Sequence, residues 1–253
     1  MKIKLSSIFS LENKVVLITG AGRGIGNYLA KKLSLENAHV YAIDKYFPKK
    51  MSDSNIKQIK CDITNKKKFY AACKTIFEEH NKIDVLINNA GLSFPSSSEE
   101  YSEDNWKKTL DVNLTASYFC SLHAIKFMKK NNAGSIINIT SLNAERAFPK
   151  NPAYVASKGG LKMLSKSLAK DWGKFGIRVN NLGPGYIKTD MTKKSFKNKK
   201  SRAEREKQTL LGRWGEIDDL VGPCVFLASD ASNYITGQDL YVDGGWLANG
   251  GIS

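Results

Sequence analysis

The stretch of residues 14–26, which reads KVVLITGAGRGIG, constrains the fold of this chain more than any other. It begins with an aliphatic run from Val15 to Ile18, typical of a strand buried on both faces of a parallel sheet. Four glycines follow at alternating positions and allow a tight turn with bare backbone close to a ligand. Apolar residues then recur at helical spacing. Together these elements present backbone N–H groups and a positive helix end where a pyrophosphate could bind.

The rest of the chain alternates between short apolar runs and amphipathic segments. Helical periodicity appears in segments such as 102–130 and 220–227. We expect strands over residues 15–18, 40–43, 56–61, 85–87, 136–140, 177–182 and 240–242. This alternation predicts an α/β fold, a Rossmann-like doubly wound parallel sheet of about seven strands flanked by helices. The length suits one large domain, which we assign to residues 1–253.

Composition and charge argue against several classes of protein. No apolar run approaches the roughly 20 residues that span a bilayer, and residues 1–14 are too polar for a secretory signal. We therefore expect a cytoplasmic protein that binds no membrane. The four cysteines and three histidines are dispersed, which predicts reduced core thiols and no metal site. The net charge of +15 comes mainly from lysine, and we assign it to solvated helix faces rather than to a nucleic-acid site.

Polar motifs follow several of the predicted strands. Asp44 ends the second strand, about 20 residues after the glycine turn, where a carboxylate meets the ribose hydroxyls of a dinucleotide. Residues 88–91 read NNAG, and their small side chains leave room for a cofactor while asparagine amides bridge strands. Ser141 ends the fifth strand. Tyr154 and Lys158 then lie one turn apart on one face of a helix.

The last three residues suit hydride transfer between a secondary alcohol and a nicotinamide ring. A proton must leave or join the alcohol oxygen in that reaction, and a free tyrosine, with a pKa of about 10, is a poor base at neutral pH. A lysine ammonium one turn away, together with the positive nicotinamide ring, is expected to lower the pKa of Tyr154. Ser141 would hydrogen-bond the same substrate oxygen and stabilise developing charge.

From about Phe9 to Leu247 the chain resembles the short-chain dehydrogenase/reductase family, with the TGxxxGxG turn, NNAG and YxxxK in family order. The resemblance implies catalysis by Ser141, Tyr154, Lys158 and Asn113. Asn113 would kink its helix and hold a water in the proton path. The implied cofactor contacts are Gly20, Arg23, Gly24, Ile25, Gly26, Asp44, Asp62, Ile63, Asn89, Ala90, Gly91, Tyr154, Lys158, Pro184, Gly185, Ile187 and Thr189. A homotetramer and a basic mobile substrate lid at about residues 190–212 are also implied.

The choice of cofactor depends on opposing charges. Asp44 would repel the 2′-phosphate of NADP, whereas Arg23 and Lys45 would attract it. Repulsion between a buried carboxylate and a phosphate should outweigh mobile bases at the rim. We therefore predict NAD, with NADP as the open alternative.

The C-terminal segments 212–215, 226–238 and 242–248 resemble those of sugar-acid dehydrogenases, of the gluconate 5-dehydrogenase and 2-deoxygluconate 3-dehydrogenase types. This resemblance predicts a small-molecule substrate, a sugar acid or related polyol, whose carboxylate Arg146, Lys150 or the basic lid would bind. Two alternatives stay open. A 3-oxoacyl-[acyl-carrier-protein] reductase would use NADPH and an acidic protein partner. A nucleotide-binding sensor would keep the fold without turnover, and a broken Ser-Tyr-Lys set would indicate it.

Overall fold

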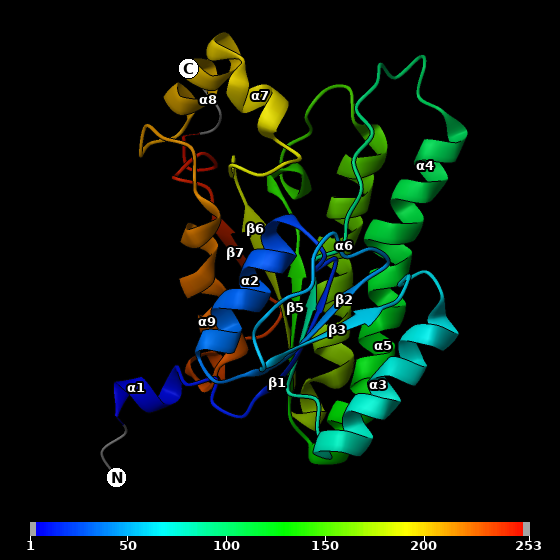
Figure 1. Ribbon diagram of the computed structural model, residues 1–253. Coiled ribbons are helices and arrows are strands. Elements are labelled where there is room, and N and C mark those ends of the chain that lie inside the picture. Colours follow the sequence, from blue (N-terminus) through cyan, green and yellow to red (C-terminus); the bar gives the residue numbers. More distant parts are fainter. Residues whose placement is uncertain (1–3, 250–253) are drawn as a thin grey trace.

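Seven strands form one parallel sheet in the computed structural model, which describes residues 4–249 (Figure 1). Residues 1–3 and 250–253, which the predicted domain includes, lie outside the described residues. The strands are β1 (Val15–Thr19), β2 (His39–Asp44), β3 (Ile56–Lys60), β4 (Val85–Asn88), β5 (Gly134–Ile139), β6 (Ile177–Pro184) and β7 (Asp239–Val242). Their order is β3-β2-β1-β4-β5-β6-β7. The predicted doubly wound sheet is confirmed, and each strand ends within two residues of the expected bounds.

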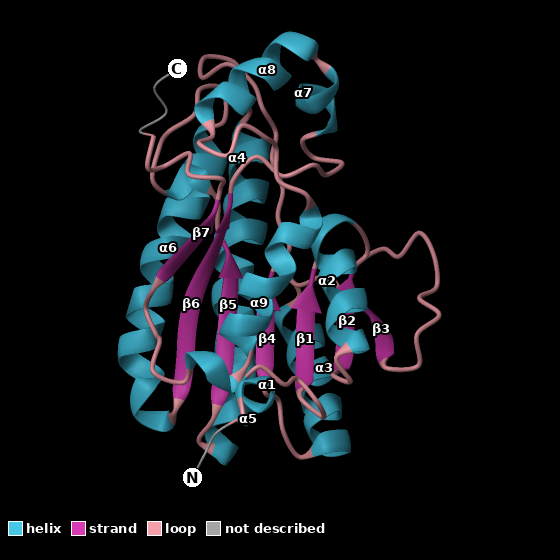
Figure 2. Cartoon of the chain, turned by 90° about the vertical axis from the view of Figure 1, so that its left-hand side faces the viewer, coloured by secondary structure: helices cyan, strands magenta, loops and turns pink. Residues whose placement is uncertain are grey.

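Helices cover both faces of the sheet, as Figures 1 and 2 show from two sides. One face carries α2 (Gly24–Leu35) and α9 (Val221–Ala228). The other carries α3 (Lys66–His80), α4 (Glu103–Leu110), α5 (Ser117–Met128) and α6 (Pro152–Trp172). The short helix α1 (Leu5–Ile8) precedes β1. Two helices, α7 (Lys193–Lys197) and α8 (Lys199–Gln208), lie above the carboxyl ends of β6 and β7.

The apolar core consists of two layers, one on each face of the sheet. Val15 and Leu17 of β1 belong to a buried cluster with residues of α3, α5 and α6. Val16 and Ile18 belong to a second cluster with residues of α2 and α9. Because successive side chains of a strand point to opposite faces, a strand covered on both sides needs an unbroken apolar run.

A row of hydrogen-bonded polar side chains crosses the sheet on the face that α6 covers. The four links measure 2.8, 2.7, 2.6 and 2.7 Å between the donor and acceptor atoms. The row runs from Asn88 through Asn138, Ser165 and Asn181 to Asp239. It thereby joins β4, β5, α6, β6 and β7. We refer to it as the polar row.

Two segments contain helical turns whose type or extent apolar periodicity does not predict. The lysine-rich segment forms α7 and α8, and the Asn198 side chain caps α8 by accepting a hydrogen bond from the Ser201 N–H at 3.0 Å. A π-helical turn over Asp111–Ala116 joins α4 directly to α5. Both features depend on local hydrogen bonds and packing that apolar periodicity does not encode.

Residues 4–249 contain neither a membrane-spanning helix nor a cluster of potential metal ligands. None of the helices in this range is long and apolar enough to cross a bilayer. No group of three or more potential metal-binding side chains gathers there. All four cysteines are buried free thiols, as predicted.

The sheet order determines where a ligand can bind. The connections from β1 lead outward to β2 and β3 on one side, whereas β4 and the later strands lie on the other. The carboxyl ends of β1 and β4 therefore meet at a topological switch point, where ligands of open α/β sheets bind.

Candidate active site

Two glycines of the turn after β1 have left-handed backbone conformations. Gly20 has a φ of +66° and Gly24 a φ of +59°. A Cβ atom at Gly20 would lie 2.6 Å from the Ala90 Cα atom, whereas one at Gly24 would meet nothing within 4 Å. The turn thus packs against the NNAG segment on one side and leaves open space at the amino end of α2. Free backbone N–H groups at such a helix end can bind a pyrophosphate.

Hydrogen bonds tie this turn to the end of β4. The Asn89 amide donates to the carbonyl oxygens of Thr19 and Gly20 at 2.9 and 3.0 Å. The Thr19 hydroxyl accepts hydrogen bonds from the N–H groups of Asn89 and Ala90 at 3.1 and 3.2 Å. Asn88 links β4 to β5 through the polar row. The predicted bridging by the two asparagines is therefore confirmed.

Asp44 is held against the glycine turn at the carboxyl end of β2. Its Oδ2 atom accepts a hydrogen bond from the Gly22 N–H at 2.9 Å, and its Oδ1 atom accepts one from the Tyr46 N–H at 3.1 Å. The side chain is half-buried, whereas those of Arg23 and Lys45 are exposed. The carboxylate is thus fixed while both bases extend into solvent.

Asp62 and Ile63 follow β3 at the same edge of the sheet. The Asp62 carboxylate accepts hydrogen bonds from the Thr64 N–H and hydroxyl at 3.0 and 2.8 Å. Burial acts to raise the pKa of Asp62, but these hydrogen bonds and the Lys45 charge hold it below its ordinary value. Asp62 therefore presents a charged carboxylate at the edge where the family resemblance places the adenine ring.

Asn113 is buried inside the π-helical turn, so the predicted irregularity of this helix is present. Its Oδ1 atom accepts from the Leu92 N–H at 2.7 Å, and its Nδ2 atom donates to the Ser157 hydroxyl at 3.1 Å. A Cβ atom at Gly91 would lie 3.6 Å from Asn113 Oδ1 and 3.8 Å from Lys158 Nζ. The fold thus gathers NNAG, Asn113 and Lys158 at one place. π-Helical turns recur at functional sites.

Lys158 and Tyr154 project from one face of α6, which begins with Pro152 at its first position. The Lys158 Nζ atom is buried and donates a hydrogen bond to the Ile139 carbonyl at 2.6 Å. It lies 5.6 Å from the centre of the Tyr154 ring. Burial lowers the pKa of Lys158 from 10.5 to about 8.

The fold brings Ser141 and Tyr154 within hydrogen-bonding distance of each other. The Ser141 hydroxyl accepts a hydrogen bond from the Asn143 N–H at 3.2 Å at the start of the short turn Leu142–Ala144. Burial raises the pKa of Tyr154 above its ordinary value, and the hydrogen bond with Ser141 offsets only part of that rise. The expected lowering by Lys158 is therefore not found in the chain alone, because burial opposes the phenolate. A positive charge bound beside the hydroxyl must supply the rest.

The turn after β6 packs closely against its neighbours. A Cβ atom at Gly185 would lie 2.6 Å from the Asp243 Cα atom, so only a glycine fits beside Pro184. Ile187 is buried and pairs with Gly215 in a parallel bridge. The N–H of Thr189 donates to the Thr192 hydroxyl at 3.0 Å. The predicted cofactor contacts of this segment thus have a fixed backbone.

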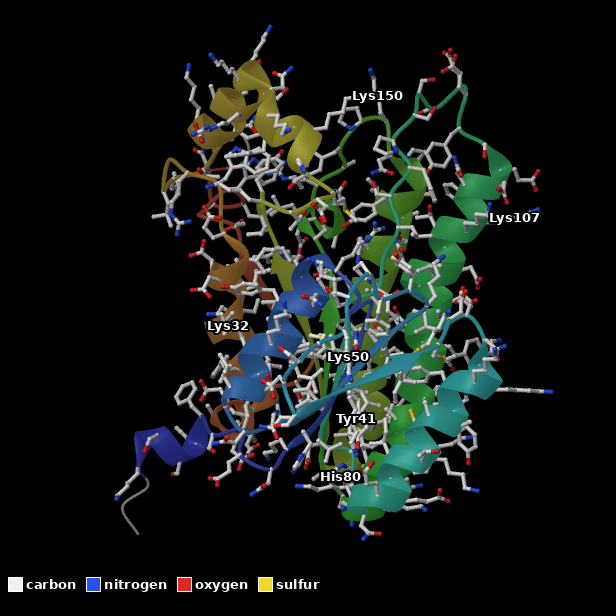
Figure 3. All side chains as sticks on the ribbon, viewed as in Figure 1. Lys32, Tyr41, Lys50, His80, Lys107 and Lys150 are labelled. Carbon is white, nitrogen blue, oxygen red and sulfur yellow. The ribbon has the colours of Figure 1, made fainter. Side chains whose placement is uncertain are left out.

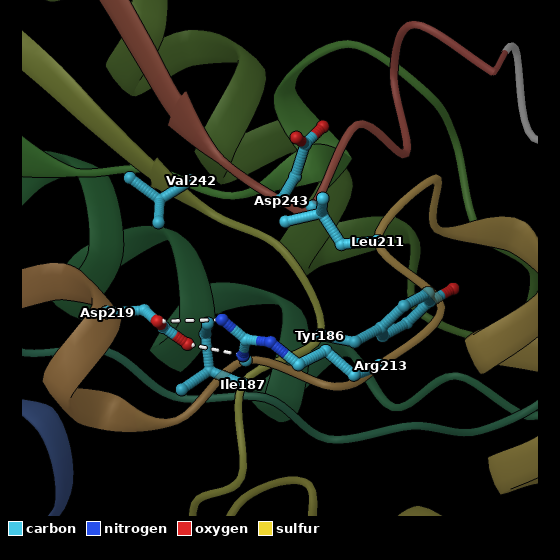
Figure 4. A pocket seen from close by; sticks show the side chains of 9 residues that line it. Tyr186, Ile187, Leu211, Arg213, Asp219, Val242 and Asp243 are labelled. Atoms are coloured by element: carbon cyan, nitrogen blue, oxygen red, sulfur yellow. Dashed lines mark hydrogen bonds and ion pairs between the residues drawn. The ribbon is translucent and has the colours of Figure 1, made fainter.

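A cavity of about 150 Å³ lies beside this turn (Figure 4). Tyr186 and Leu211 border it together with Asp243. Arg213 also lines it and makes two hydrogen bonds to Asp219, at 2.7 and 3.0 Å between the guanidinium nitrogens and the carboxylate oxygens. The charge of Arg213 is thus paired with a carboxylate of the same chain, at an exposed position.

Arg146 and Lys150, the predicted carboxylate-binding residues, lie on the connection from β5 to α6. Both side chains are exposed. Lys150 extends from the end of the molecule opposite to that of Tyr41 and His80 (Figure 3). Its backbone has a left-handed φ of +64°. Both cations are close in sequence to Ser141, but their side chains extend into solvent.

Five aromatic side chains form a cluster over the turn after β6 that the sequence analysis does not single out. Neighbouring ring centres are 5.3 to 6.2 Å apart. The members, which we call the aromatic wall, are Phe148, Tyr186, Phe196, Trp214 and Trp246. They come from separate segments, so only the fold brings them together.

The carboxyl edge of the sheet suits a nicotinamide dinucleotide. The open end of α2 at Gly24 can take the pyrophosphate, and Asp44 is fixed where a ribose would lie. Small residues at Ala90 and Gly91 leave space beside Lys158. The residues present therefore fit the pyrophosphate and a ribose of this cofactor, with space beside Lys158 for the rest.

Comparison with known proteins agrees with this geometry. The profile of a family described as "Enoyl-(Acyl carrier protein) reductase" matches residues 20–247. The chain is 37% identical over 248 residues to the 2-dehydro-3-deoxy-D-gluconate 5-dehydrogenase of Pseudoalteromonas atlantica, covering 94% of this chain and 98% of the relative. It is 36% identical over 246 residues to the gluconate 5-dehydrogenase of Gluconobacter oxydans, covering 94% and 96%.

A solved structure gives the same result. The gluconate 5-dehydrogenase from Burkholderia cenocepacia, in complex with NADP and tartrate, matches with a TM-score of 0.89 and 32% identity, covering 96% of this chain and 98% of that one. Fold and sequence agree over nearly the whole length. The chain therefore belongs to the short-chain dehydrogenase/reductase family and is a nicotinamide-dependent oxidoreductase that acts on CH–OH groups.

Proposed function

We propose that this enzyme interconverts a secondary alcohol of a sugar acid and the corresponding ketone, with NAD as its cofactor. The observation that carries the proposal is the cluster of Ser141, Tyr154 and Lys158 beside Gly91 of the NNAG segment. The relatives named for sugar acids support the substrate class. The complete Ser-Tyr-Lys set argues against a sensor without turnover.

Each residue of the cluster has a separate role in the proposed reaction. The nicotinamide ring, when bound, carries the hydride. Tyr154 takes the alcohol proton during oxidation and returns it during reduction. Ser141 hydrogen-bonds the same oxygen and stabilises the charge that develops there. Lys158 holds the nicotinamide ribose and passes protons through water toward Asn113.

The proposed preference for NAD depends on the fixed carboxylate of Asp44. A phosphate on the ribose 2′-oxygen would lie beside this charge, while the opposing bases Arg23 and Lys45 are exposed and screened by solvent. The Burkholderia cenocepacia structure contains NADP, so NADP use is the direct alternative. We propose that the other cofactor contacts are those that the family resemblance predicts.

Replacing Asp44 with asparagine tests this preference. The amide keeps an oxygen for the Gly22 N–H but removes the negative charge. We expect kcat/KM with NADP to rise about tenfold relative to that with NAD, because repulsion of the 2′-phosphate is lost. Steady-state kinetics with both cofactors measures the ratio. Asp171→Asn removes an exposed charge at the end of α6 and serves as the control. An unchanged ratio in Asp44→Asn would contradict the assignment.

The substrate class is tested by the rate of NAD or NADP reduction over a panel of aldonates, neutral sugars and simple secondary alcohols. We expect turnover with NAD and an aldonate. Reduction of 3-oxoacyl thioesters with NADPH, and no oxidation of aldonates, would instead establish the acyl-carrier-protein reductase. No turnover with any member of the panel would favour the sensor.

We also propose a cytoplasmic homotetramer with a lid at about residues 190–212, from the resemblance to the family. Four buried free thiols suit a reducing compartment. The helices α7 and α8 of the lid lie above the carboxyl ends of β6 and β7. Light scattering on the eluted peak of a size-exclusion column would give the mass of four chains, and a mass of one or two chains would refute the tetramer.

A further inference from the structure

The aromatic wall connects the catalytic residues to the lid. Phe148 lies on the connection between Ser141 and Tyr154, and its ring centre is 6.2 Å from that of Tyr186. Tyr186 directly follows the Pro184-Gly185 turn and lies 5.4 Å from Trp214. The wall therefore runs from the β5–α6 connection, between Ser141 and Tyr154, to Phe196 of α7.

One arginine of α8, Arg205, contacts this wall. The Arg205 guanidinium carbon is 4.8 Å from the centre of the Tyr186 ring and 5.5 Å from that of Trp214. Burial raises the pKa of Tyr186, and the charge and hydrogen bond of Arg205 offset part of that rise. The Arg205 side chain is half-buried. A guanidinium stacked on rings keeps its N–H edge available for a planar anion.

Three other cations near the wall already have carboxylate partners. Arg202 pairs with Glu206 at 2.9 Å, and Lys188 pairs with Glu216. Arg213 pairs with Asp219 at 2.7 Å, as Figure 4 shows. Within residues 4–249, Arg205 is in contact with the wall and has no carboxylate partner. Its charge is thus available to a ligand.

The position of Arg205 suits a carboxylate better than the exposed cations do. An ion pair at an exposed site such as Arg146 or Lys150 is screened by solvent and contributes little. A half-buried guanidinium with a fixed plane can bind a carboxylate through two parallel hydrogen bonds. Stacking also reduces the side-chain freedom that is lost on binding.

We propose that Arg205 binds the carboxylate of the sugar-acid substrate and selects it over neutral polyols. This inference rests on the proposed function. It assigns the carboxylate to one lid residue, in preference to Arg146 and Lys150. The aromatic wall holds the guanidinium, and the hydroxyl carbon of the same substrate faces Ser141 and Tyr154.

The test compares Arg205→Gln with Arg205→Lys, on the aldonate that the wild type oxidises best and on the matching alditol, in which CH2OH replaces the carboxylate. We expect Arg205→Gln to raise KM for the aldonate about tenfold to hundredfold, with a smaller change in kcat and unchanged kcat/KM for the alditol. Arg205→Lys should restore part of the affinity. Lys207→Gln removes an exposed charge from the same helix and should behave as the wild type.

The outcomes separate this inference from the proposed function. If the wild type oxidises no aldonate, the proposed function fails, and this assignment fails with it. If the wild type does so but Arg205→Gln keeps the wild-type KM, only the role of Arg205 is refuted. An equal loss for aldonate and alditol would show that Arg205 merely supports the lid. A raised KM in Arg146→Ala alone would place the carboxylate on the β5–α6 connection.

Discussion

Replacing Tyr154 with phenylalanine is expected to lower kcat by about 10²- to 10⁴-fold, the usual contribution of a positioned acid or base. The ring would still pack on α6, but the alcohol oxygen would have no partner to exchange a proton. Binding of the cofactor, followed by quenching of protein fluorescence, should change little. Loss of turnover with retained cofactor binding would assign the proton transfer to the hydroxyl.

A matched variant makes this result specific. Tyr234 is fully exposed in the connection before β7, so Tyr234→Phe removes a hydroxyl from the surface without touching the cleft. We expect wild-type rates for it. A Tyr154→Phe enzyme that keeps more than about a tenth of the wild-type kcat would show that another group transfers the proton.

Replacing Lys158 with methionine is expected to abolish activity and yet stabilise the cofactor-free protein at pH 7. Burial lowers the pKa of Lys158 from 10.5 to about 8 in the folded chain. Between these values the unfolded chain binds a proton that the folded chain has lost, so the wild type gains stability as the pH rises through this range. Below pH 8 the buried charge lowers the free energy of unfolding of the wild type by its full amount, about 3 kcal/mol.

The methionine variant removes that cost but leaves the Ile139 carbonyl without its hydrogen bond, which opposes the gain by about 1 kcal/mol. We therefore expect a free energy of unfolding about 2 kcal/mol higher than that of the wild type at pH 7. The advantage should disappear by about pH 10. Urea denaturation without cofactor at both pH values measures it.

The control for this prediction is Lys170→Met, which replaces an exposed lysine of the same helix. Its stability relative to the wild type should not depend on pH in this range. If Lys158→Met were less stable than the wild type at pH 7, packing around the ammonium would outweigh its desolvation, and the pKa assignment would be wrong.

The strands and the placement of the candidate catalytic residues follow from the sequence because both depend on local patterns. A strand covered on both faces requires an unbroken apolar run such as Val85 to Ile87, whichever helices cover it. Tyr154 and Lys158 share a helix face because they are four residues apart. The carboxyl ends of parallel strands meet at one edge, so Ser141 is brought to the same place by topology.

The electrostatics of the site could not be predicted in the same way. The sequence shows a lysine one turn from Tyr154 and predicts a lowered tyrosine pKa. The fold instead buries both groups and directs the Lys158 ammonium to the Ile139 carbonyl. Burial then shifts the pKa of each group so that its neutral form is favoured. The depth of burial depends on the whole fold.

The role of the lysine-rich segment also depends on distant partners. Read along the chain, residues 193–207 contain bases and a single aromatic residue, which is typical of a solvated surface. In the structure, Arg202 stacks on Phe196, and Arg205 stacks on Tyr186 and Trp214. Contacts between segments that are separated in sequence leave no periodicity to detect.

The polar row has a consequence for how this enzyme can diverge. Asn138, Ser165 and Asn181 each donate one hydrogen bond to the next member and accept one from the last, so changing any of them breaks two links in the core. The end members Asn88 and Asp239 keep other partners in Ser121 and Lys166. Substitutions at the three middle positions are therefore coupled, and their effects on stability are not additive. Divergence at these positions requires changes that occur together, because each side chain sets the donor or acceptor that its neighbours need.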